Sequence, residues 1–115
     1  MNVSRGRFFE NQVKNHLKHK NFNIICSNFY TPYGEIDIIA EKDKIIYFIE
    51  VKYLTKINII NPIKKIDIPK LRRIYFSISY LKKFCKILDY QVDSYSVYFK
   101  QNKINFEYYP DLRLY

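Results

Sequence analysis

The segment spanning residues 34–53 constrains the fold more than any other part of the sequence, because it is dense in strand-forming residues. It reads GEIDIIAEKDKIIYFIEVKY, with two apolar-rich runs separated by the polar residues 41–44. β-Branched and aromatic residues at this density favour the packed, pleated environment of a strand. The polar break is long enough only for a tight reversal, so the segment predicts an antiparallel hairpin.

The position of the turn decides which residues of the hairpin face one another. We expect the turn to be centred on residues 42–43, which pairs Ala40 with Ile45 and Asp37 with Phe48. Side chains alternate between the two faces of a strand. The pairing therefore also decides which charged residues share a face.

Three charged residues, Asp37, Glu50 and Lys52, interrupt the apolar hairpin. In the expected register Asp37 lies diagonal to Glu50, Glu35 lies opposite Glu50, and Lys52 shares the face of Glu50. Unpaired charges are costly on a buried sheet face. A group of acids with one lysine therefore needs a compensating partner, and a divalent cation would supply it.

The chemistry of these side chains suits a hydrolytic metal site. Mg²⁺ prefers oxygen ligands, takes one or two carboxylates, and completes its shell with waters and substrate phosphate. We expect Asp37 and Glu50 to bind Mg²⁺ or Mn²⁺, with the backbone carbonyl of Val51 as a third ligand. Lys52 could hold the attacking water or stabilise charge that develops on the phosphorus oxygens.

Length and composition favour one domain, residues 1–115, with one sheet and two or three helices. No apolar run approaches the roughly 20 residues that a membrane helix needs. The polar N-terminus has no signal-peptide pattern, so we expect a cytoplasmic protein with no membrane association. Cys26 and Cys85 have no metal-ligand spacing, and we expect both to be buried free thiols, with a disulfide as the alternative.

The formal net charge of +9 favours a polyanionic partner, and nucleic acid before a membrane. The alternative is that the lysines and arginines only solvate the surface. Charge alone does not separate these two interpretations.

Sequence periodicity predicts the remaining elements in order. Residues 5–20 predict a helix, on which Glu10 lies near the core-facing side, and residues 22–29 predict a strand. Residues 54–66 are expected to be a mobile connection. A second helix should start near Asp67 and extend its apolar stripe to Leu88. Lys70 in its first turn could then reach the acidic face. Residues 91–99 and 103–108 predict two further strands.

The hairpin motifs also carry a family resemblance that extends over nearly the whole chain. GEIDIIA…YFIEVK resembles the GEIDLIA…FVEVK signature of the YraN-like proteins, which have a restriction-endonuclease-like fold. The other matching positions are Gly6, Glu10, Asn28, Pro69, Lys70, Arg72, Arg73, Val92 and Asp93.

This resemblance implies an α/β fold, with a central mixed sheet flanked by helices, and metal-dependent phosphodiester cleavage. The pattern is also similar to archaeal Holliday-junction resolvases and to the PD-(D/E)xK nucleases in general. It implies catalytic roles for Glu10, Asp37, Glu50 and Lys52, with Glu35 as an added acid. Two positions depart from the family, because Tyr30 and Gln91 stand where it has arginines. Both departures remove phosphate-contacting charge.

Three functions are consistent with these features. The first is a metal-dependent endonuclease on branched, nicked or flapped DNA, in which Lys70, Arg72 and Arg73 grip the backbone. The second is a non-catalytic nucleic-acid-binding module in repair, recombination or RNA metabolism. The third is a structural role, in which Glu50 and Lys52 form a sheet ion pair and an aromatic surface forms a dimer. A homodimer is also an expectation of the first function, because symmetric junction cutting needs two sites.

Overall fold

The computed structural model describes residues 5–54 and 68–114. Seven elements lie within these ranges. In chain order they are helix α1 (Arg5–His19), strands β1 (Asn23–Thr31), β2 (Gly34–Lys42) and β3 (Ile45–Tyr53), helix α3 (Ile68–Leu81), and strands β4 (Tyr90–Lys100) and β5 (Lys103–Tyr109).

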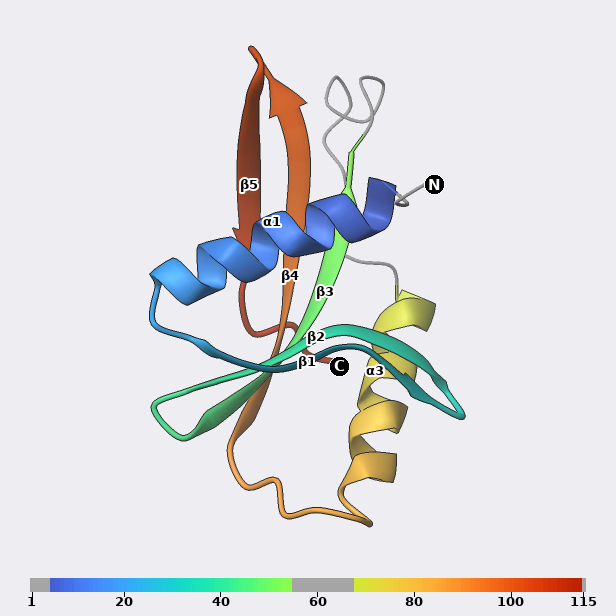
Figure 1. Cartoon of the computed structure of the whole chain (residues 1–115). Coiled ribbons are helices and arrows are strands. Elements are labelled where there is room, and N and C mark those ends of the chain that lie inside the picture. Colours follow the sequence, from blue (N-terminus) through green and yellow to red (C-terminus); the bar gives the residue numbers. More distant parts are fainter. Residues whose placement is uncertain (1–4, 55–67, 115) are drawn as a thin grey trace.

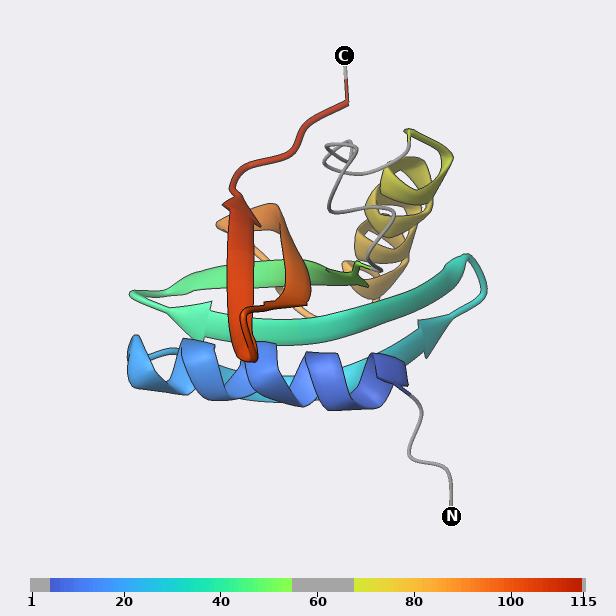
Figure 2. The ribbon, with the colours of Figure 1, turned by 90° about the horizontal axis from the view of Figure 1, so that it is seen from above.

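The strands form one mixed sheet in the order β1-β2-β3-β4-β5. Only the β3–β4 pair is parallel, and the other neighbours are antiparallel. Helices α1 and α3 lie on opposite faces of the sheet (Figures 1 and 2). This arrangement confirms the expected α/β fold with a central mixed sheet, and it is compatible with a restriction-endonuclease-like fold.

Each helix buries one apolar stripe against its own face of the sheet. Phe9, Val13 and Leu17 recur every four residues along α1 and are buried, as that spacing requires of a helix packed on one side. On the opposite face α3 buries Leu71 and Ile74 among the apolar side chains of the central strands. The sheet is therefore covered on both sides. No helix in the described ranges is long and apolar enough to cross a lipid bilayer.

The hairpin exists as predicted, but its expected register is wrong by two residues. The turn is formed by Asp43 and Lys44, with φ of 52° and 66°, and Lys42 pairs with Ile45. A two-residue hairpin loop of this kind needs positive φ at both central positions. The composition does not reveal this conformation, because neither residue is glycine. A shift of two residues does not by itself move any side chain to the other face.

Two smaller expectations are also wrong. Helix α3 ends at Leu81, so Leu88 does not extend its stripe and is exposed. Both cysteines are free, but Cys85 is exposed and Cys26 is only half-buried. Asp67 and nearly all of the expected connection lie outside the described residues.

Candidate functional site

The candidate site lies where β2 and β3 separate. Their pairing ends at Ile38 and Ile49, although both strands continue, and Figure 1 shows the two strands diverging beyond this point. Continued by one residue, the register would set Asp37 opposite Glu50. Instead Asp37 Oδ2 accepts a hydrogen bond of 2.8 Å from the backbone N–H of Val51. In a continued β-ladder this N–H would donate to a backbone carbonyl of β2. The Asp37 carboxylate accepts the hydrogen bond instead, and this bond holds the Asp37 side chain in the fork, the place where β2 and β3 separate.

A local distortion of β1 supports this arrangement. Asn28 stands where the β1–β2 register would oppose Asp37, and its backbone has a φ of 53°. Asparagine tolerates this left-handed conformation better than most residues. Across this point Ile36 packs in the α3 core and Ile38 in the α1 core, although strict alternation would place both on one face. The distortion therefore breaks the regular alternation at Asp37.

Three acids converge beside this distortion. Carboxylate oxygens of Glu10 from α1 and of Glu35 and Asp37 from β2 lie within 4.8 Å of one another. The side-chain amide of Asn28 donates to Glu10 Oε1 at 2.8 Å and to Glu35 Oε1 at 2.9 Å. One amide thus connects the helix and the strand. The expected position of Glu35 opposite Glu50 is wrong, because the β2–β3 pairing is shifted by two residues and ends at Ile38 and Ile49.

Glu50 is buried, with 3% of its side chain exposed, and its carboxylate forms an ion pair with the ammonium group of Lys70. Lys70 lies in the first turn of α3 and its side chain is 44% exposed. The expected reach of Lys70 to the acidic face is therefore confirmed. The alternative in which Lys52 is the partner of Glu50 is wrong. Lys52 is half-buried on β3, beside Ser96 of β4.

The pKa values reflect this crowding of acids. Burial, followed by the charge of Glu50, raises the pKa of Asp37 to about 8, and the Val51 amide opposes the rise. Burial also raises the pKa of Glu50, against the opposing effect of Lys70. For Glu35 burial acts in the same direction, but hydrogen bonds from Asn28 and other neighbours outweigh it and the pKa is lowered. Removing these carboxyl groups from water favours their neutral forms.

The donor atoms of the site fit a hard divalent cation. Those that converge are carboxylate oxygens, with neither sulfur nor imidazole among them, and such a set suits Mg²⁺ or Mn²⁺ better than zinc. The oxygens that gather belong to Glu10, Glu35 and Asp37, and Glu50 adjoins them through its contact with Asp37. The backbone amide of Val51 donates to Asp37. The backbone carbonyl of Val51 stays a predicted ligand of the cation.

Some of the predicted site residues contact one another in the structure, and the others lie nearby on the same elements. Glu10, Glu35, Asp37, Glu50 and Lys70 form one chain of contacts. The other nucleic-acid-binding candidates, Arg72 and Arg73, are exposed on α3. Lys52 lies on β3, two residues beyond Glu50.

Two residues of the site were not assigned to it from sequence. Asn28 holds Glu10 and Glu35, and the side chain of Tyr30 hydrogen-bonds Glu35. The only sequence signal was the family match at Asn28, next to the departure at Tyr30.

A family model described as "Uncharacterised protein family UPF0102" matches residues 9–97, which include every acid of the site. The chain belongs to this family. It is 36% identical over 98 residues to a UPF0102 protein of Campylobacter fetus, with 84% of each chain covered. It is 38% identical over 97 residues to one of Fervidobacterium nodosum, covering 84% of this chain and 72% of that protein. A Campylobacter jejuni relative is 39% identical over 89 residues, covering 76% of this chain and 78% of that protein.

UPF0102 is the YraN family, so the resemblance noted in the sequence is confirmed. Its members are predicted endonucleases with a restriction-endonuclease-like fold. Membership indicates a nuclease-like role, and the names of the relatives specify no activity.

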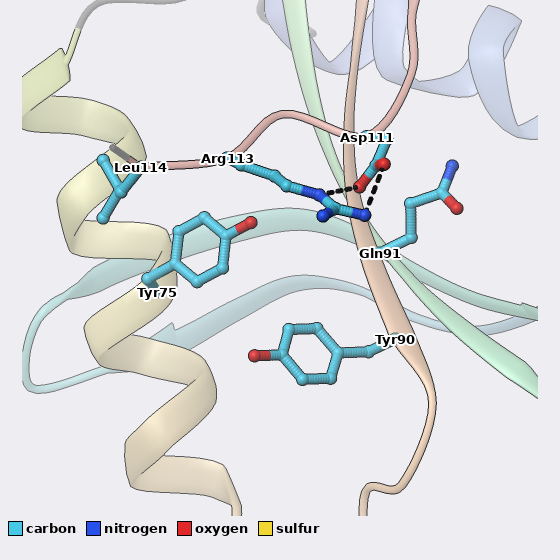
Figure 3. Close-up of a pocket in the computed structure, with 6 residues that line it drawn as sticks. All are labelled: Tyr75, Tyr90, Gln91, Asp111, Arg113 and Leu114. Atoms are coloured by element: carbon cyan, nitrogen blue, oxygen red, sulfur yellow. Dashed lines mark hydrogen bonds and ion pairs between the residues drawn. The ribbon is translucent and has the colours of Figure 1, made fainter.

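A hollow of about 400 Å³ lies apart from the acids, between α3, the start of β4 and the C-terminal segment (Figure 3). Its lining includes Tyr75, Tyr90 and the paired side chains of Asp111 and Arg113. The segment is held in place by hydrogen bonds from the Tyr75 hydroxyl to the Leu112 carbonyl, at 2.5 Å, and from the Asp111 amide to Asp93, at 2.9 Å. These bonds hold the C-terminal segment against α3 and β4, so Tyr75 and Asp93 have a structural role here.

Proposed function

We propose that this protein is a divalent-metal-dependent endonuclease that hydrolyses phosphodiester bonds in structured DNA. The observation that carries the proposal is the convergence of Glu10, Glu35 and Asp37 beside the Glu50–Lys70 pair. These residues come from two helices and two strands, so folding is needed to bring them together. Three clustered acids, beside a fourth that forms an ion pair with Lys70, form an environment that a divalent cation would stabilise.

Each residue has a distinct part in the proposed reaction. Asp37 and Glu50 would hold Mg²⁺ or Mn²⁺ with the Val51 carbonyl, and Glu10 and Glu35 would bind the cation's water shell or a second ion. The cation, when bound, supplies Lewis-acid stabilisation and a more acidic water. The ammonium group of Lys52 would orient that water and stabilise negative charge on the phosphate oxygens.

The substrate proposal rests on charge. The chain carries a net charge of +9, and α3 presents exposed Arg72 and Arg73 one turn or less from Lys70. These side chains would contact phosphates and would not read bases, because backbone contacts carry no sequence information. We therefore favour DNA recognised by its structure, such as branched, nicked or flapped forms.

One observation favours a second function, a nucleic-acid-binding module that does not cleave. Lys70 already neutralises Glu50, and Asn28 already bonds Glu10 and Glu35. Within the described residues, every buried side-chain polar atom has a hydrogen-bond partner. The acidic cluster could therefore be stable without an ion.

The test is incubation of the protein with branched, flapped, nicked and single-stranded DNA and with single-stranded RNA, with and without Mn²⁺. We expect cleavage only when metal is present. Asp37→Asn and Lys52→Ala should each reduce the cleavage rate by about a hundredfold or more while binding persists, since each removes a group that acts on the transition state. Asp43→Asn and Lys18→Ala change exposed residues of the same types and should keep full activity.

Binding of the wild-type protein without cleavage of any substrate would reject the enzyme and support the binding module. Cleavage that persists unchanged in Asp37→Asn would show that these acids are not the site. Absence of both binding and cleavage would reject both functions.

A further inference from the structure

Aromatic side chains, three of them exposed and one half-buried, form a continuous row along α3. The row consists of Tyr33 in the β1–β2 turn, Phe76 and Tyr80 on α3, and Phe84 just after it; we call it the aromatic stripe. Ring centroids are 5.6 Å apart for Tyr33 and Phe76, 6.3 Å for Tyr33 and Tyr80, and 5.1 Å for Tyr80 and Phe84. Phe76 is 51% exposed and Phe84 is 70% exposed.

The stripe is not part of the core. Helix α3 buries Leu71, Ile74 and Ile78 against the sheet, whereas Phe76 lies on the exposed side and Tyr80 is half-buried. Burying a phenylalanine side chain would gain about 1.5–3 kcal/mol, so exposed rings forgo substantial stabilisation. Single exposed apolar residues are ordinary, but a contiguous group of them marks an interaction surface.

The stripe starts at the candidate active site. Arg73 lies beside Gly34, because a Cβ added at Gly34 would be 3.9 Å from Arg73 Cδ. Gly34 directly precedes Glu35, and Lys70, one turn before Arg73, pairs with Glu50. From there the aromatic rings continue along α3, away from the acids.

Positive charge surrounds the stripe. Arg72, Arg73 and Lys83 are exposed on or just beyond α3, and α3 contains no aspartate or glutamate. A surface that combines exposed rings with cations suits a partner that has flat apolar faces and a negative backbone. An unpaired nucleic-acid strand has both, whereas a duplex hides its base faces inside the stack.

We propose that the aromatic stripe binds an unpaired strand of nucleic acid, whose bases stack on the exposed rings while its phosphates contact the flanking cations. The proposal rests on the function proposed above and specifies its substrate class. The preferred substrate carries a single-stranded segment next to the bond that is cut. The stripe leads this strand to the acids.

The test measures binding without cleavage, in the presence of EDTA. The probes are a fluorescein-labelled oligothymidylate of about 20 nucleotides and a duplex of the same length, both followed by fluorescence anisotropy. Stacking is worth about 1–3 kcal/mol per base, which corresponds to about 5- to 150-fold in affinity. We expect the double variant Phe76→Ala/Phe84→Ala to bind oligothymidylate at least about 10-fold more weakly and the duplex within about 3-fold of wild type.

Two further variants separate stacking from general effects. Phe76→Tyr/Phe84→Tyr keeps both rings and should retain wild-type affinity. Phe99 is a similarly exposed ring, 52% exposed, and it packs on Phe8 of the opposite helix α1. The control variant Phe99→Ala should therefore leave oligothymidylate binding unchanged. Circular dichroism and thermal unfolding would show that each variant is folded.

The outcomes distinguish the two proposals. A wild-type protein that binds neither probe overturns the stripe, whereas the proposed function is decided by the branched, nicked and flapped substrates described above. If the protein binds the duplex, and if wild type and Phe76→Ala/Phe84→Ala bind oligothymidylate equally well, the proposal for the stripe is overturned. The proposed function then still stands. A wild-type dimer in light scattering that becomes monomeric in Phe76→Ala/Phe84→Ala, with oligothymidylate affinity kept, would identify the stripe as a contact between two copies and overturn the proposal.

Discussion

The carboxyl group of Asp37 is subject to two opposing influences. The Val51 amide donates to it and favours its ionised form, while burial and the neighbouring Glu50 favour the protonated form. Burial prevails in the metal-free protein, and the pKa rises to about 8. A bound cation would reverse this balance, because it stabilises the ionised carboxylate. The same group therefore supports the fold and would respond to a bound ion.

This balance predicts how the stability of the metal-free protein depends on pH. An acid with a raised folded-state pKa binds its proton more tightly when folded, so its contribution is complete below its ordinary pKa of 3.8 and is lost as the pH rises through about 8. In EDTA, the free energy of unfolding in urea should fall by a few kcal/mol between these values. Mn²⁺ should reduce the fall.

The contribution of Asp37 is isolated by comparison with Asp37→Asn, which cannot ionise and should flatten the profile. Asp43→Asn, at an exposed turn position, should keep the wild-type slope. A wild-type profile that rises over this range, or that coincides with that of Asp37→Asn, would contradict the raised pKa.

At the scale of elements, the β2–β3 turn sets the geometry of the site. Asp43 and Lys44 both have left-handed backbones, and their turn fixes the register that ends at Ile38 and Ile49. The fork that holds Asp37 begins where this ladder stops. The turn at the far end of the hairpin therefore sets which residues of β2 and β3 face each other up to the fork.

The backbone of this turn predicts a stabilising substitution. A non-glycine residue with φ of 66° is strained, and glycine adopts that conformation without a steric cost. Lys44→Gly should therefore raise the free energy of unfolding by about 0.5–1 kcal/mol, measured by urea denaturation. Lys18→Gly in α1 should lower it by about 1 kcal/mol. If Lys44→Gly is destabilising as well, the turn does not have the described conformation.

At the scale of the whole molecule, the acidic residues and the basic and aromatic residues lie in different places. The acids meet inside the fork of the sheet, and the exposed cations and rings of α3 lie outside it. A net charge of +9 would favour the approach of a polyanion to the surface even though the site itself is acidic. This arrangement fits a protein that holds a backbone with α3 and acts on it at the fork.

The charge distribution predicts a salt-dependent affinity. The logarithm of the binding constant should fall linearly with the logarithm of the salt concentration, by about 0.7 per phosphate contact for a single strand and about 0.9 for a duplex. Arg72→Gln should reduce this slope by about one unit and weaken binding equally across sequences, measured by anisotropy. Lys103→Gln, on the edge strand β5, should leave the slope unchanged. Tight binding that is insensitive to salt would contradict the proposed phosphate contacts.

Much of the fold was predictable because local patterns encode it. The spacing of Phe9, Val13 and Leu17 predicted α1, and the two apolar runs predicted the hairpin. The register was not predictable, since Asp43 and Lys44 carry no glycine to indicate a left-handed turn. The end of α3 at Leu81 was also missed, because the apolar pattern continues beyond it to Leu88.

The residue types alone establish which chemistry is present: the acids of GEID and IEVK, a basic second helix and a positive net charge. How these groups meet depends on the three-dimensional packing of the chain. Lys70 becomes the partner of Glu50 because α3 starts beside the fork, and Asn28 joins Glu10 to Glu35 because its backbone turns left-handed. Such contacts join residues far apart along the chain, and their geometry depends on packing that no local pattern specifies.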